Sequence, residues 1–226
     1  MSPEWLRLKA RIEQFVTLQS EPLELGGQQL DWYRVTNGER LLAIAVQSAH
    51  SAEELDPFWA TTWRAAVGLD RFMSQYDLQD ARILELGCGS GQAGVGLALR
   101  GARVTLTDAV GIALLVARLN AWPVKKRVYV RRLKWDAPTL QEPHFPRIIG
   151  SDLVYDPSHF PLLERCARLH LSPGGRLFLS EPYRHTGDHF AQWIVQAGWQ
   201  TIEHEVDLAD GRVPIRVFEC GLEPNL

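Results

Sequence analysis

The segment from Ile83 to Asp108, ILELGCGSGQAGVGLALRGARVTLTD, limits the possible folds of this chain most strongly. It contains a short apolar run, a glycine-rich turn, a helical stretch and a second apolar run that ends in an acid. Two short apolar runs joined through a helix are typical of a parallel strand–helix–strand unit. Open α/β sheets bind ligands where such strands end. The sequence therefore predicts a pocket for a nucleoside-bearing ligand at the carboxyl edge of a parallel sheet.

The same alternation continues along the chain. Two final strands near 201–208 and 213–220 are separated only by Ala209-Asp210-Gly211-Arg212, which predicts an antiparallel hairpin. The predicted fold class is α/β: a Rossmann-like, doubly wound, seven-stranded sheet, mostly parallel, with one antiparallel strand at the C-terminal end. The other expected strands are 81–86, 103–107, 127–133, 147–151 and 176–181, and the expected helices are 92–100, 110–120, 158–170 and 188–197.

Residues 1–57 are expected to form an N-terminal extension packed on the core, and residues 58–226 to form the ligand-binding domain. Apolar residues at helical spacing from Trp5 to Val16 predict a helix in the extension. Asn37-Gly38, between the strand-like runs 31–36 and 39–46, predicts a hairpin turn. A second helical pattern runs from Phe58 to Tyr76.

Composition excludes several classes of protein. The net charge of −3 does not favour nucleic-acid binding. The three cysteines are scattered without metal-ligand spacing, and the seven histidines show no ligand set, so we expect free thiols and no metal. The N-terminal residues lack the apolar run of a signal peptide, and no segment is long enough to cross a bilayer. We therefore expect a cytoplasmic protein without membrane or nucleic-acid partners, and its oligomeric state is left open.

The glycine motif Gly89-Ser90-Gly91-Gln92-Ala93-Gly94 fits the pattern GxGxxG, which alone is a weak signal for a dinucleotide. Glu85, just before the glycines, discriminates between ligands. A pyrophosphate binds backbone N–H groups and a positive helix end, so a nearby carboxylate would weaken its binding. A ligand that carries an ammonium and a sulfonium is instead attracted by that carboxylate. The predicted cofactor is therefore S-adenosyl-L-methionine.

Other residues of this segment have expected contacts with the same cofactor. The glycine loop, with Gly87, Cys88, Gly89 and Gly91, lets the methionine part of the ligand lie against the backbone. Asp108 follows the second strand, where an acid accepts both ribose hydroxyls. NAD would use that acid in the same way, so Asp108 does not discriminate between the two cofactors.

The segments ELGCGSG (85–91) and VTLTD (104–108) resemble motifs I and II of the class I, seven-β-strand, S-adenosylmethionine-dependent methyltransferases. The resemblance extends over roughly residues 58 to 220. The segment SDLVY (151–155) resembles the DxxY signature of a protein-lysine methyltransferase group, which includes the valosin-containing-protein and electron-transfer-flavoprotein β-subunit enzymes. Further segments similar to that group are TWRAA (62–66), LKWD (133–136) and EPYR (181–184), the last of which matches DPGR with Glu for Asp and Tyr for Gly.

This resemblance implies roles for five more residues. Trp63, Trp135 and Ser151 are expected to contact the cofactor, with Trp135 beside the adenine. Asp152 and Tyr155 are expected to orient a lysine amine through its hydrogens while aromatic walls desolvate it. Either Asp152 or water would accept the proton.

The resemblance thus implies a methyltransferase that acts on a lysine of a protein partner. Three alternatives remain open at this point. They are a small-molecule N- or O-methyltransferase, an NAD-dependent oxidoreductase, and a non-catalytic module that binds the cofactor. The basic runs 125–127 and 131–134 are interpreted as a solvated face, or as a surface that docks an acidic protein.

Overall fold

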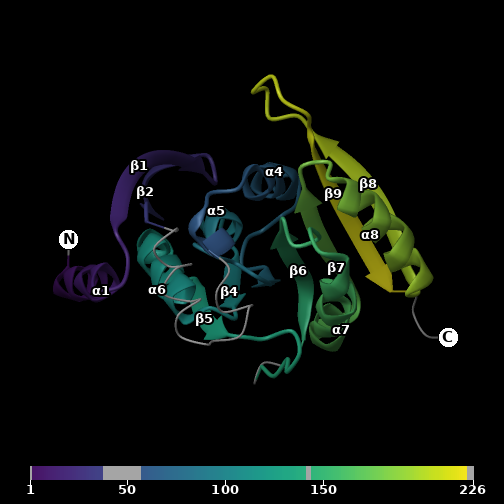
Figure 1. Ribbon diagram of the computed structural model, residues 1–226, viewed down its shortest axis with the longest axis horizontal. Coiled ribbons are helices and arrows are strands. Elements are labelled where there is room, and N and C mark those ends of the chain that lie inside the picture. Colours follow the sequence, from purple (N-terminus) through teal and green to yellow (C-terminus); the bar gives the residue numbers. More distant parts are fainter. Residues whose placement is uncertain (1, 38–56, 141–143, 223–226) are drawn as a thin grey trace.

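The computed structural model describes residues 2–37, 57–140 and 144–222. Its central layer is a seven-stranded sheet in the order β5-β4-β3-β6-β7-β9-β8 (Figure 1). The five strands β5, β4, β3, β6 and β7 are parallel to one another, and β9 runs antiparallel to both β7 and β8. The predicted sheet is confirmed, with β9 as its reversed strand. The strands are β3 (Arg82–Glu85), β4 (Arg103–Asp108), β5 (Val128–Arg132), β6 (Phe145–Ser151), β7 (Leu171–Glu181), β8 (Trp199–Val206) and β9 (Ile215–Leu222).

Helices cover both faces of the sheet because its strands carry apolar residues on both sides. Ile83 packs in one apolar cluster with residues of α4 and α5, whereas its neighbour Leu84 packs in a second cluster with residues of α7 and α8. Successive side chains of a strand point to opposite faces, so this alternation places the two clusters on opposite sides. The helices are α4 (Arg64–Met73), α5 (Gln92–Leu99), α6 (Gly111–Asn120), α7 (Phe160–His170) and α8 (His185–Gln196).

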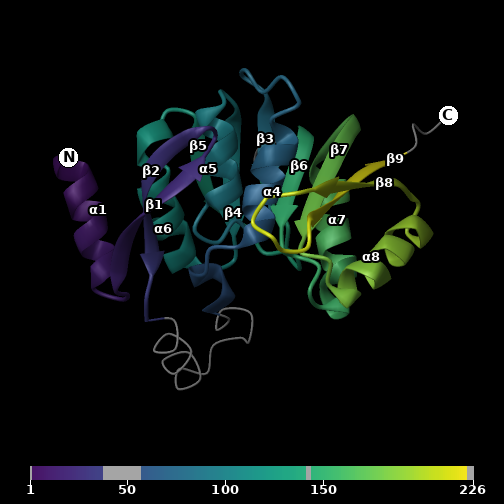
Figure 2. The ribbon, with the colours of Figure 1, turned by 90° about the horizontal axis from the view of Figure 1, so that it is seen from above.

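The N-terminal residues lie at the end of the molecule opposite β8 and α8 (Figure 2). They form the predicted helix, α1 (Pro3–Glu13), and a two-stranded sheet of β1 (Leu18–Leu25) and β2 (Gln28–Val35). Trp5 and Ile12 of α1 pack with Ala113 and Val116 of α6 in a third apolar cluster. The division into an extension and a domain at residue 57 stays a prediction.

The predicted hairpin around Asn37-Gly38 stays a prediction, because its second strand lies outside the described residues, but its first strand has a partner that was not predicted from the sequence. Residues 28–35 pair with the preceding residues 18–25, through a turn at Gly26-Gly27. Both glycines have positive φ, 59° and 74°, which a two-residue turn with the twist of a hairpin requires. Asn37 instead accepts a hydrogen bond from the Thr17 backbone N–H at 2.8 Å, at the open end of the same hairpin. Residues 38–46 lie outside the described residues.

The helix expected from Phe58 to Tyr76 is divided in two. A short 3-10 helix, η1 (Pro57–Ala60), is followed by extended backbone at Trp63, with φ −107° and ψ 135°, before α4 begins. The Trp63 N–H donates to the side-chain Oε1 of Gln92 at 3.1 Å, which is a long-range contact that periodicity does not encode. Another 3-10 helix, η3 (Pro157–His159), similarly precedes α7. Both interruptions bring side chains toward the cavity described below.

Asp70 of α4 joins the hairpin to the core. It is buried, it accepts a hydrogen bond from the Gly26 N–H at 3.0 Å, and both its oxygens contact Arg100, at 2.9 and 3.2 Å. Removing one partner of a buried ion pair leaves the other charge and the amide without compensation.

We therefore predict that Asp70→Ala lowers the free energy of unfolding by about 2–3 kcal/mol in urea denaturation. Glu13→Ala is the matched control, because it removes a more exposed ion pair with Lys9 on α1. That control is expected to change the free energy by less than about 0.5 kcal/mol. Equal effects of the two substitutions would show that Asp70 does not anchor the hairpin.

Candidate active site

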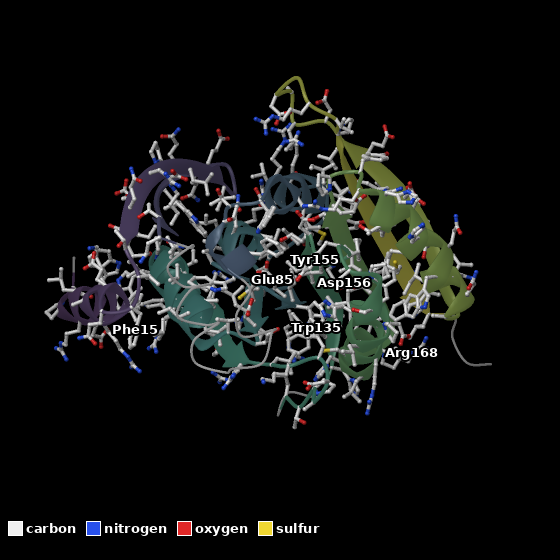
Figure 3. All side chains as sticks on the ribbon, in the orientation of Figure 1. Phe15, Glu85, Trp135, Tyr155, Asp156 and Arg168 are labelled. Carbon is white, nitrogen blue, oxygen red and sulfur yellow. The ribbon has the colours of Figure 1, made fainter. Side chains whose placement is uncertain are left out.

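A cavity of about 720 Å³ opens at the carboxyl ends of β3, β4 and β6, the edge predicted from the sequence. This volume is within the usual range for small-molecule sites. Figure 3 shows Glu85, Trp135, Tyr155 and Asp156 gathered in the middle of the molecule, with Phe15 and Arg168 toward opposite sides. Nine of the residues predicted for the site line the cavity: Trp63, Gly87, Cys88, Gly89, Asp108, Trp135, Ser151, Asp152 and Tyr155. The other two, Glu85 and Gly91, lie outside its lining.

The loop between β3 and α5 has a backbone that only glycine adopts easily. Gly87, Gly89 and Gly91 have φ of 56°, 52° and 89°. A Cβ on Gly89 would lie 3.1 Å from the Trp59 carbonyl oxygen, so a side chain there would crowd the cavity edge. A Cβ on Gly91 would instead lie 3.2 Å from Ala117 Cβ of α6. Gly89 therefore leaves room for a ligand, whereas Gly91 allows two helices to pack closely.

Asp108 connects this loop to the end of β4. Its Oδ2 accepts from the Gly89 N–H at 2.8 Å, and its Oδ1 accepts from the Val110 N–H at 2.9 Å. Burial raises the pKa of its carboxyl group above the ordinary value. Each carboxylate oxygen can accept a second hydrogen bond, so Asp108 retains acceptor capacity for ligand hydroxyls.

Glu85 lies beneath the loop. It is 1% exposed, and its Oε2 accepts from the Gly94 N–H at 2.9 Å in the first turn of α5. Its Oε1 accepts no hydrogen bond from the described residues. Burial, and to a smaller extent the charge of Asp108, raise the pKa of Glu85 to about 8. The expected interaction with a cationic ligand would therefore act through the loop, and it requires Glu85 to lose its proton.

Asp152 follows β6 on the other side of the cavity. Its carboxylate is buried and is held by Arg184, from Nε to Oδ1 and from Nη2 to Oδ2, each at 2.9 Å. Arg184 also lines the cavity, and its guanidinium carbon lies 5.9 Å from the centre of the Trp63 ring. The sequence showed Arg184 only as part of a motif and did not identify its partner.

Aromatic side chains form a nearly continuous wall between Trp63 and Trp135. Phe58 packs edge-on against Trp63 and Tyr155, with ring centres 6.2 and 5.9 Å apart. His159 makes similar contacts with Tyr155 and Trp135, at 6.2 and 6.3 Å. Phe58 and His159 were not predicted as site residues, because each lies on a 3-10 helix that the helical pattern did not reveal.

Within the described residues, no cluster of three or more histidine, cysteine, aspartate or glutamate side chains could hold a metal ion. His185 and His189 lie close together, with ring centres 4.4 Å apart, and lack a third ligand. None of the helices in the described ranges is long and apolar enough to span a membrane.

A family model described as lysine methyltransferase matches residues 51–193, more than half of the chain. The chain belongs to this lysine methyltransferase family. The match includes the glycine loop, Asp108, the aromatic wall, Asp152 and Arg184. The resemblance found in motifs I and II is thereby confirmed, and membership disfavours the oxidoreductase alternative.

Two curated relatives and one solved structure illustrate the range of this similarity. The chain is 34% identical over 138 residues to the protein N-lysine methyltransferase METTL21A of Xenopus tropicalis, covering 58% of the chain and 63% of the relative. It is 35% identical over 133 residues to a ubiquinone biosynthesis O-methyltransferase of Xanthomonas oryzae, covering 58% and 55%. The chain thus spans about three fifths of the length of these relatives.

The solved structure is the glycopeptide N-methyltransferase MtfA in complex with S-adenosyl-L-methionine. It superposes with a TM-score of 0.60 at 16% identity, over 70% of this chain and 94% of that one. At this identity the likeness shows a shared fold.

The raised pKa of Glu85 predicts a pH-dependent stability. In the folded protein this group holds its proton up to about pH 8, whereas its ordinary pKa is 4.5. The folded state binds this proton more tightly than the unfolded state does, and this difference contributes to the free energy of unfolding. The contribution is fully present below about pH 4.5 and is lost as pH rises through about 8.

The substitution Glu85→Gln replaces the titrating carboxyl group with a neutral amide, whose oxygen can still accept the hydrogen bond from the Gly94 N–H. We expect the wild-type protein to lose stability relative to this variant by on the order of a few kcal/mol between pH 5 and 8.5. Urea denaturation of both proteins across this range measures the difference, and the titration of Asp108 is common to both. Parallel stability curves would contradict the burial of a titrating Glu85.

Proposed function

We propose that this protein is an S-adenosylmethionine-dependent methyltransferase whose acceptor is a lysine side chain of another protein. The observation that carries the proposal is the position of Asp152 and Tyr155 in the same cavity as the glycine loop, within a chain of the lysine methyltransferase family. The donor and acceptor groups would then meet in one enclosed space.

The described residues fit the proposed cofactor. The glycine loop leaves backbone exposed to the cavity, Asp108 has acceptor capacity for ribose hydroxyls, and Trp135 offers a flat face for the adenine. Oε1 of Glu85 is buried and has no hydrogen-bond partner among the described residues, and a cationic ligand would stabilise the ionised form of this carboxyl group. The cofactor supplies an electrophilic methyl group on a positively charged sulfur.

The protein itself would contribute alignment and desolvation. A lysine amine has an ordinary pKa of about 10.4, so it must lose a proton before it can act as a nucleophile. The aromatic wall disfavours the charged form of the amine by excluding water. Asp152 and Tyr155 would orient the amine toward the methyl group, and holding the reacting atoms in line can contribute about 7–11 kcal/mol.

A second candidate is a small-molecule O-methyltransferase. It is favoured by the 35% identity to a ubiquinone biosynthesis O-methyltransferase, which is similar to the identity to METTL21A. The family model favours the lysine acceptor. The cytoplasmic location and the absence of nucleic-acid and membrane partners stay predictions.

The test is methyl transfer from labelled S-adenosylmethionine to two fractions of a cell extract, one of proteins and one of small molecules. We expect label in the protein fraction, on lysine, as mass spectrometry of the labelled proteins would show. Label confined to the small-molecule fraction would establish the second candidate. Cofactor binding without transfer to either fraction would indicate a non-catalytic module.

The role of Asp152 gives a sharper prediction. Asp152→Ala should lower methyl transfer at least about 100-fold while the affinity for the cofactor, measured by calorimetry, stays within a few fold. Asp207→Ala is the control, because Asp207 is exposed and its side chain accepts from the Ala209 N–H in its own turn, while the bond from Arg71 goes to its backbone carbonyl, which the substitution keeps. Transfer by Asp152→Ala at the wild-type rate would remove Asp152 from the reaction.

A further inference from the structure

The part of the cavity lined by Asp152, Tyr155 and Arg184, here called the acceptor half, has to orient an amine without stabilising its charged form. A carboxylate that faces a lysine amine stabilises its ammonium form, which cannot attack a methyl group. Asp152 is such a carboxylate, buried at the end of β6. A site that uses Asp152 to orient an amine therefore needs a way to prevent it from holding the amine as an ion.

Arg184 meets this requirement by its geometry. Both Asp152 oxygens accept from the guanidinium at 2.9 Å, so the carboxylate already has a cationic partner with bidentate geometry. The pair together has no net charge. Each oxygen can still accept one more hydrogen bond, so the pair can bind the N–H of a neutral amine.

The backbone of Arg184 is held on both sides. Its N–H donates to the Glu181 carboxylate, and its carbonyl oxygen accepts from Arg216 Nη2 at 3.4 Å. Arg216 also donates to Glu181 at 2.6 Å, and this ion pair is almost completely buried. The position of Arg184 therefore results from a network beneath it.

Tyr183 extends this network. It has a φ of 56°, a left-handed conformation that glycine, the residue of the similar DPGR motif at this point, adopts more easily. Its ring lies 4.7 Å from the Arg216 guanidinium carbon, and its hydroxyl donates to Glu205. A strained backbone kept in place by several contacts is typical of functional sites.

We infer that Arg184 is a positioning residue that neutralises Asp152, so that the acceptor amine is oriented without being held as an ammonium ion. The inference deepens the proposed function and rests on it. The ammonium proton passes to water. The nitrogen lone pair then forms the N–C bond as the C–S bond breaks, and the electron pair of that bond stays on sulfur.

Other charged and titratable groups also face this part of the cavity or the pair. Glu181 approaches Arg184 from the end of β7, and Tyr155 follows β6. The rest of the cavity lining contributes Cys88, Asp108, Lys134, Asp136, Asp156 and His159. All of them are unchanged in the variants below, so their effects cancel when pH profiles are compared.

The test is the pH dependence of methyl transfer to the protein fraction labelled by the wild-type enzyme, at saturating cofactor, from pH 6 to 10. Arg184→Met keeps the length of the side chain but leaves Asp152 uncompensated. On the acid side of the profile the methyl-transfer rate rises with pH, and we call this rise the acid limb. For Arg184→Met the acid limb should move to higher pH by about one unit or more, and the rate should approach that of the wild type at high pH. Arg184→Lys should retain the wild-type limb, because it keeps the charge.

A second variant tests the same account with the opposite sign. Asp152→Asn leaves the Arg184 cation uncompensated, so the acid limb of its residual activity should move to lower pH. Arg212→Met is the control, because Arg212 is exposed on the β8–β9 connection, and its profile should match wild type. These opposite shifts do not follow from a loss of structure.

Three results would overturn the inference. Arg184→Met could lower the rate equally at every pH, which would indicate a purely structural role. Asp152→Asn and Arg184→Met could shift the limb in the same direction. A wild-type enzyme that transfers no label to protein lysine would refute the proposed function, and the inference with it, whereas the first two results leave the proposed function intact.

Discussion

The site depends on two buried acids that hold the glycine loop and the start of the helix after it. Glu85 accepts from the Gly94 N–H in the first turn of α5, and Asp108 accepts from the Gly89 N–H within the loop. Burial raises the pKa of both carboxyl groups, so the protein maintains this arrangement at a cost in stability. Such perturbed groups cluster at functional sites, where a ligand of opposite charge relieves the cost. A cationic methyl donor on the loop would do so, whereas a pyrophosphate would increase it.

The acidic side chains on the two sides of the cavity have different kinds of partner. On the donor side, the hydrogen bonds that Glu85 and Asp108 accept within the described residues come from backbone amides. On the acceptor side, Asp152 is paired through both oxygens with Arg184. The first arrangement attracts a positive charge, and the second orients a polar group without attracting one. This difference is consistent with a cationic donor and a neutral amine that meet within one aromatic-walled space.

Local sequence signals predicted most of the fold, because strand and helix periods and the glycine turn are encoded within a few residues. Nine of the eleven predicted site residues line the cavity. Four of the nine come from the glycine motif and the acid after the second strand, and the other five were implied by the family resemblance. Two features were missed for different reasons. The hairpin of β1 and β2 is local, and its turn signal, Gly26-Gly27, was overlooked. The break before α4 depends on Gln92, far along the chain, so no local pattern reveals it. The depth of Glu85 and the pairing of Asp152 with Arg184 likewise depend on the assembled sheet edge.

The central claim is that a cationic donor bound on the loop is paired with a buried carboxylate, which must then ionise. Calorimetric titration with S-adenosyl-L-methionine near pH 7, in buffers of different ionisation enthalpy, measures both the affinity and the number of protons exchanged. The account predicts that the wild-type protein binds this donor and releases more protons than Glu85→Gln does. Equal proton exchange by the two proteins, or no heat with this donor together with tight binding of a nicotinamide dinucleotide, would contradict it.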